Sequence, residues 1–97
     1  MNYTNLTQND TWVITQDHDV CNDSPNATPE QVAQLKKDGF TAHFKMYDDD
    51  GILYYSGYGK PLTDVEGFEP LDDYGMPNAG CTEIKYRDSV TGKYETL

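Results

Sequence analysis

Residues 40–57, Phe-Thr-Ala-His-Phe-Lys-Met-Tyr-Asp-Asp-Asp-Gly-Ile-Leu-Tyr-Tyr-Ser-Gly, decide the fold. In the first half of this stretch, Ala42, Phe44 and Met46 alternate with polar or amphipathic residues. A period of two is typical of a strand with one buried face and one solvated face. We therefore expect a strand here, at the centre of a small sheet.

The second half of the stretch predicts a tight reversal and a return strand. Residues 48–51 have turn chemistry, because Asp side chains accept hydrogen bonds from nearby backbone N–H groups and Gly51 can adopt a positive φ. Residues 52–55 are rich in residues that favour strands. The whole stretch thus predicts a β-hairpin whose tip carries three carboxylates.

The chain of 97 residues is expected to form one domain with a thin, aromatic core. A domain of this size buries only about 60–65% of the surface of its unfolded chain, so its stability is modest. Aliphatic residues are few, but the eight tyrosines, three phenylalanines and one tryptophan bury a large area per residue. The expected core residues are Trp12, Phe40, Phe44, Tyr54, Tyr55 and Phe68.

The strongest helix signal begins at Thr28. Thr28, Pro29 and Gln31 suit the N-cap, the first helical position and the N3 position, which is the pattern of a capping box. Gly39 suits the position that follows the end of a helix. The sequence thus predicts a short helix over residues 29–38, which needs contact with the sheet for its stability.

Three further segments have the composition of strands: residues 12–15, 81–87 and 93–97. Residues 1–10 are polar and show no period, so they predict a loose N-terminal arm. Residues 58–80 are rich in Gly, Pro and carboxylates and predict a long acidic loop. Together these patterns predict a single α+β domain over residues 1–97, with a small twisted antiparallel sheet of four or five strands and one short helix packed on one face.

The formal net charge of −10 limits the classes of partner. A strongly negative protein repels DNA, RNA and anionic membranes, and it attracts basic surfaces, including those that bind nucleic acid. The simpler alternative is that the charge only keeps the protein in solution. No stretch approaches the ~18 apolar residues of a membrane span, and the N-terminus lacks the pattern of a signal peptide. We therefore expect a cytoplasmic protein.

Metal and cofactor signals are weak, and we expect no bound metal and no cofactor. If Gly51 took the glycine position of an EF-hand loop, Gly57 would stand where a bidentate Glu is needed. The sequence also holds four candidate zinc ligands: His18, Cys21, His43 and Cys81. They lack the two close ligand pairs of structural zinc sites. The two cysteines are expected as free thiols.

Motifs for catalysis are absent from the sequence, which has no Gly-rich phosphate loop, no Ser nucleophile elbow and no H-E-x-x-H. A Cys–His dyad stays open as an alternative, because such pairs meet in space rather than in sequence. We therefore expect a protein that is not an enzyme, with a thiol-based or metal-binding enzyme as a further alternative.

Carboxylates cluster in three predicted loops or turns: at Asp17, Asp19 and Asp23, at the hairpin tip, and within residues 58–80. Carboxylates on neighbouring loops can approximate the charge spacing of duplex DNA, about one charge per 1.7 Å, and can occupy a basic groove. Tyrosines beside them supply rigid contact area with a polar tip. The candidate partner-binding residues are Asp48, Asp49, Asp50, Tyr58, Asp64, Glu66, Glu69, Asp72, Asp73 and Tyr74.

Residues 12–15, 44–57, 70–75 and 79–84 resemble segments of short uncharacterised acidic proteins of bacteria and their phages. In size, acidity and lack of catalytic motifs, the chain is also similar, at the level of class, to phage-encoded anti-CRISPR and anti-restriction inhibitors. That similarity implies a phage-type inhibitor of host defence. Together with the clustered carboxylates, it leads us to expect a DNA mimic that binds a basic, nucleic-acid-binding protein or complex and blocks it. The alternative is a small structural or assembly protein of a phage or its host, acidic for solubility only.

Overall fold

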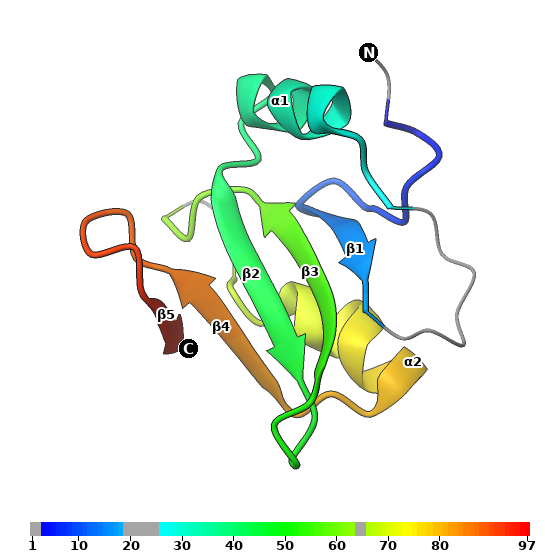
Figure 1. The fold of residues 1–97 in the computed structure, drawn as a ribbon, viewed down its shortest axis with the longest axis vertical. Coiled ribbons are helices and arrows are strands. Elements are labelled where there is room, and N and C mark those ends of the chain that lie inside the picture. The colour runs from blue at the N-terminus through cyan, green and yellow to red at the C-terminus, as the bar shows by residue number, and fades with distance from the viewer. Residues whose placement is uncertain (1–2, 19–25, 64–65) are drawn as a thin grey trace.

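The computed structural model describes residues 3–18, 26–63 and 66–97. A single antiparallel sheet has the strand order β1-β3-β2-β4-β5, with the hairpin β2–β3 at its centre (Figure 1). This arrangement confirms the predicted α+β class and the predicted central hairpin. The strands are β1 (Trp12–Asp17), β2 (Ala42–Tyr47), β3 (Leu53–Gly59), β4 (Glu83–Arg87) and β5 (Tyr94–Thr96).

The β2–β3 hairpin follows the chemistry of its sequence. Phe44 and Met46 are fully buried. At the tip, the Asp48 carboxylate accepts hydrogen bonds from the backbone N–H groups of Asp50 and Ile52, both at 2.9 Å. Gly51 has a φ of 79°, which an L-residue rarely adopts. The Asp48 side chain is therefore part of the turn itself.

One face of the sheet is covered by a helical segment, in which a π-helical turn η1 (Leu71–Gly75) runs directly into α2 (Met76–Ala79) (Figure 1). The prediction of a loop over residues 58–80 is wrong here, and it is also wrong at its start, which belongs to β3. The sequence does not predict this helical segment, because Gly75 and Pro77 disfavour helices. Tertiary packing overrides that preference: Leu71 is buried against the sheet, and a Cβ atom on residue 75 would lie 2.6 Å from the Met46 sulfur atom.

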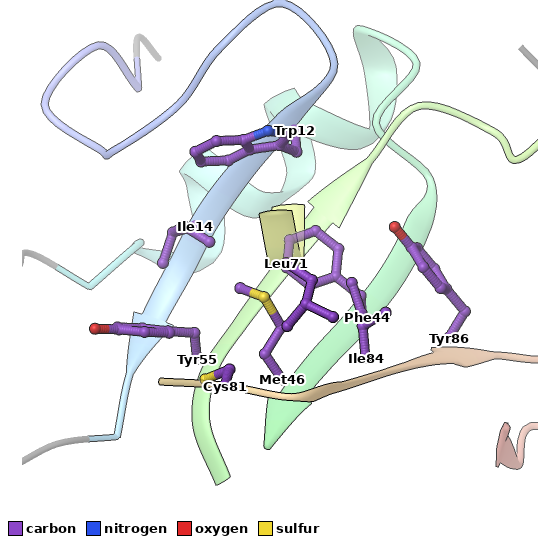
Figure 2. Close-up of a cluster of buried hydrophobic side chains, with 9 residues drawn as sticks. All are labelled: Trp12, Ile14, Phe44, Met46, Tyr55, Leu71, Cys81, Ile84 and Tyr86. Atoms are coloured by element: carbon purple, nitrogen blue, oxygen red, sulfur yellow. The ribbon is translucent and has the colours of Figure 1, made fainter. Parts of the chain in front are cut away.

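The main core lies between the sheet and this helical segment (Figure 2). Of the predicted core residues, Trp12, Phe44 and Tyr55 belong to it. Phe68 is 46% exposed, so its assignment to the core is wrong; it lies in a turn that precedes the helical segment. The full cluster is Trp12, Ile14, Phe44, Met46, Tyr55, Leu71, Cys81, Ile84 and Tyr86.

A second, smaller core lies on the opposite face of β1. There Val13 packs with Leu35 of α1 (Pro29–Lys37) and with Phe40, at the end of the sheet away from the hairpin tip (Figure 1). The predicted capping box is present, since the Thr28 side chain accepts from the Gln31 N–H and the Gln31 side chain accepts from the Thr28 N–H. The helix ends one residue earlier than predicted, at Lys37.

The prediction of a loose arm over residues 1–10 is wrong for the part that the structure describes. Leu6 is buried in the second core. The Tyr3 hydroxyl donates to the Asp38 carboxylate at 2.6 Å, and the Gln31 amide donates to Asn5 at 2.7 Å. One apolar residue and a few polar contacts fix this segment, and such contacts leave no period in the sequence.

Replacing Thr28 by Ala removes the acceptor that caps α1. We expect Thr28→Ala to lower the free energy of unfolding by ~1 kcal/mol, measured by urea denaturation. The exposed Thr82, which lies outside the helices and strands, supplies the control. A loss for Thr82→Ala as large as that for Thr28→Ala would contradict the capping role.

Gly57 allows β1 and β3 to approach each other closely. A Cβ atom there would lie 2.2 Å from the Val13 carbonyl oxygen and 2.7 Å from the Phe44 ring. We expect Gly57→Ala to cost more than ~2 kcal/mol of stability, because backbone must move. Gly51→Ala, where the Cβ atom meets nothing within 4 Å and only the positive φ is unfavourable, should cost ~1 kcal/mol. The reverse order of the two losses would contradict a close approach of the strands at Gly57.

Candidate functional site

The fold separates the two signs of charge. Between Met46 and Ile84 the sequence holds nine carboxylates and a single cation, Lys60. Lys60 does not neutralise them, since its ammonium donates to the Asp38 carbonyl oxygen at 2.8 Å and lies 4.3 Å from the centre of the Phe40 ring. We call five exposed residues in this part of the chain the acidic surface: Asp49, Asp50, Glu66, Asp72 and Asp73.

Four residues of the acidic surface form two groups. Asp49 and Asp50 are at the hairpin tip, whereas Asp72 and Asp73 are on η1. Two predicted members have structural contacts: Asp48 forms the turn, and Glu69 is half-buried and accepts a hydrogen bond from Thr11. Asp64 lies outside the described residues. Within the described ranges, no hydrogen bond or ion pair joins the tip to η1.

The two predicted anchor tyrosines do not lie on the acidic surface. Tyr74 is half-buried, with its ring centroid 4.8 Å from that of Tyr55 and 5.8 Å from that of Trp12, so it belongs to the main core. Tyr58 lies in β3 on the other face of the sheet, 4.7 Å from the His43 ring. The acidic surface therefore has carboxylates without the aromatic anchors expected beside them.

A hollow of about 310 Å³ adjoins the hairpin tip and is lined by Asp48, Asp49, Gly51, Thr82, Glu83 and Thr96. The Glu83 carboxylate accepts from the Thr96 hydroxyl at 3.0 Å and lies 3.8 Å from the Lys85 ammonium. Among residues 3–18, 26–63 and 66–97, no group of three or more His, Cys, Asp or Glu side chains is arranged to hold a metal ion. The hollow is thus acidic without being a cation site.

The face of the sheet opposite the main core carries most of the cations. In the register of β2 and β4, Lys45 and Lys85 are direct partners. Like charges in such a pair repel each other. Here each ammonium lies over an aromatic ring, Lys45 at 4.2 Å from the Tyr94 centroid and Lys85 at 5.0 Å from the Tyr47 centroid. We call this region the basic face: Lys36, His43, Lys45, Tyr47, Tyr58, Lys85, Arg87 and Tyr94.

His43 is at the centre of the basic face. Its ring contacts those of Tyr58 and Tyr94, and Nδ1 shares a hydrogen bond with the Tyr94 hydroxyl. Burial, and then the charges of Lys45, Arg87 and Lys36, lower its pKa from 6.5 to about 4. His43 is therefore neutral at pH 7, although it belongs to a strongly acidic protein.

A hollow of about 260 Å³ opens beside His43, and its lining includes no carboxylate. The lining residues are Lys36, Thr41, His43, Tyr58, Arg87, Ser89 and Tyr94. The alternation in residues 42–47 predicts His43 and Lys45 on one strand face, but nothing in the sequence indicated this site. Alternation in residues 83–87 likewise separates Lys85 and Arg87 from buried neighbours. Only the pairing of β2 with β4 brings these two pairs together.

Within the described residues, the structure does not bring the Cys81 thiol and the His43 imidazole together. Cys81 is a free thiol in the main core, whereas His43 is on the opposite face of the sheet. Burial and the nearby Asp48 raise the pKa of the Cys81 thiol to about 11, so the nucleophilic thiolate is scarce at neutral pH. His18 bonds to the Ser56 hydroxyl at 2.9 Å, and Cys21 lies outside the described residues.

Comparisons with known proteins find no matching family model, no related curated protein and no matching solved structure. The resemblance to acidic proteins of bacteria and phages stays a prediction. Nor does any helix in the described part of the chain have the length and apolar character needed to cross a membrane.

The lowered pKa of His43 predicts a pH-dependent stability. His43 takes up a proton near pH 6.5 in the unfolded chain but only near pH 4 in the folded protein. Acidification between these values therefore favours the unfolded chain, by less than ~3 kcal/mol because solvent screens a half-buried group. We expect His43→Phe to remove this contribution, so that unfolding free energies measured at pH 7 and pH 4.5 differ less than in the wild type.

The control for this experiment is His18→Asn, because His18 is the other histidine of the chain. An NMR titration of the folded protein measures the titration midpoint of each imidazole directly. A His43 titration midpoint near 6.5 would contradict the buried, cation-flanked environment.

Proposed function

We propose that the chain is a non-enzymatic binding protein that attaches to a basic protein surface through the acidic surface. The partner is a nucleic-acid-binding protein or complex of a bacterial cell, and occupation of its basic groove blocks the nucleic acid. In this role the chain acts as a cytoplasmic DNA mimic of the kind that phages use against host defence.

The segregation of charge carries this proposal. Carboxylates on the hairpin tip and on η1 are exposed, and the only cation in that half of the sequence is held at the end of α1. A surface of one sign speeds encounter with a surface of the opposite sign and selects for it. The side chains of Asp49, Asp50, Asp72 and Asp73 are exposed, so they can meet a partner without loss of core packing.

The test begins with the tagged chain as bait in bacterial lysate. A basic nucleic-acid-binding protein should be retained at low salt and released at high salt, because ion pairs at an exposed surface are screened. The captured protein is then purified, and its binding to nucleic acid is measured with and without the chain. We expect the chain to compete with the nucleic acid.

A fourfold variant identifies the surface responsible. Asp49→Asn, Asp50→Asn, Asp72→Asn and Asp73→Asn together should weaken binding to the purified partner by about tenfold at low salt. Asp48 is left in place because it forms the turn. The control is Glu30→Gln with Glu95→Gln, two exposed carboxylates on α1 and β5. If both variants weakened binding equally for each charge removed, binding would depend only on the net charge of the chain and not on the acidic surface.

The proposal fails if the chain retains no basic protein, or if capture is unaffected by salt. Retention of a second copy of the chain or of a capsid-like partner through both washes would instead favour the structural or assembly role. In that case the contact would be centred on apolar surface, and the carboxylates would serve solubility only.

A further inference from the structure

We propose that the hollow beside His43 on the basic face binds the phosphate group of a small phosphate monoester. The occupant is a single compact dianion and not a nucleic acid. This site lies on different elements from the acidic surface, so it does not depend on the function proposed above.

The first observation is the lining of the hollow. Lys36 at the end of α1 and Arg87 at the end of β4 supply two permanent cations. Thr41, Ser89 and Tyr94 add hydroxyl groups, and no carboxylate contributes to the lining. A guanidinium with an ammonium and several hydroxyls is the donor set that phosphate groups prefer.

The second observation is that these cations are not neutralised by carboxylates in the described parts of the chain. The single ion pair found there joins Lys85 to Glu83, at 3.8 Å. The nearby Asp88 carboxylate accepts hydrogen bonds from the N–H groups of Val90 and Thr91, so it is engaged in its own turn. Although the chain has a net charge of −10, these cations without carboxylate partners form a local excess of positive charge. A bound anion can neutralise this charge.

The third observation is the size of the hollow and the charge of its surroundings. At about 260 Å³ the hollow is smaller than the pockets that hold drug-sized ligands, which begin near ~300 Å³. A long polyanion would extend beyond the basic face and meet the carboxylates of the rest of the protein. A small anion is attracted by the cations without that repulsion.

His43 serves as the reporter for the site. It lines the hollow, and two of the three cations that lower its pKa, Arg87 and Lys36, line the hollow too. A bound dianion offsets their effect and makes protonation of the imidazole easier. Binding therefore moves the His43 titration toward neutral pH, and the titration of His18, which does not line the hollow, should move less.

The experiment titrates the isotopically labelled, full-length chain with inorganic phosphate and with a 5′-mononucleotide, and follows the imidazole and backbone NMR signals. Acetate and a short single-stranded oligonucleotide are the comparison ligands. We expect phosphate and the mononucleotide to shift the signals of His43 and Tyr94 saturably, and to raise the titration midpoint of His43. Acetate at equal concentration should bind at least about tenfold more weakly, because it has one charge and fewer acceptors.

Two variants test the cations. Arg87→Gln and Lys36→Gln should each weaken phosphate binding about tenfold or more. The matched control is Lys37→Gln, which removes the same charge one residue further along α1, where the side chain does not line the hollow. The fourfold Asp→Asn variant of the acidic surface should still bind phosphate, which separates this site from the partner-binding surface.

Three outcomes would overturn the inference. One is the absence of a saturable shift at His43 with either phosphate or the mononucleotide. Another is equal weakening by Lys37→Gln and Arg87→Gln, which would indicate a general effect of charge. The third is tighter binding of the oligonucleotide than of the mononucleotide, which would make the basic face a nucleic-acid surface.

Discussion

The pleat of the central hairpin is the constraint on which the rest of the structure depends. Phe44 and Met46 point to one side of β2, and therefore His43 and Lys45 must point to the other. The close approach of strands at Gly57 fixes the register, since any larger residue there would meet the Val13 carbonyl and the Phe44 ring. If the pairing of β2 with β3 slipped by one residue, the side chains of the core face would move to the basic face and the reverse. The pairing of these two strands therefore decides both which side chains form the core and where the cations lie.

This constraint gives the two faces of the sheet opposite character. The main core, covered by η1 with its exposed Asp72 and Asp73 and by α2, lies on one side, and the basic face lies on the other. A chain of net charge −10 thereby holds most of its few cations close together. This arrangement disfavours the protonated form of His43: its burial and the neighbouring positive charges lower its pKa to about 4. The aromatic rings of Tyr47 and Tyr94 partly offset the repulsion between Lys45 and Lys85.

We propose different ligands for the two surfaces for one physical reason. Electrostatic attraction over the long distances of an approach depends on the whole field of the protein, which is negative, so this field favours the large basic partner that we propose for the acidic surface. Inside a small hollow, neighbouring donors dominate, so a compact anion can bind despite the overall charge. Long-range attraction gives way to short-range contacts at a distance of about a Debye length, ~8–10 Å at physiological salt. Both surfaces can act in one protein without interfering.

The sequence by itself determined the local features of this protein. The capping box at Thr28, the Asp–Gly turn at the hairpin tip and the alternation through β2 each depend on residues within a few positions of one another, and all three appear in the structure as predicted. Tertiary structure decided what distant segments do. Residues 71–79 became helical because Leu71 and Gly75 fit the sheet, against the preferences of Gly and Pro. Tyr58 and Tyr74 lie away from the acidic surface for which they were predicted. Their positions, and the grouping of cations on the basic face, follow from the strand order, which is set by packing between segments far apart in the chain.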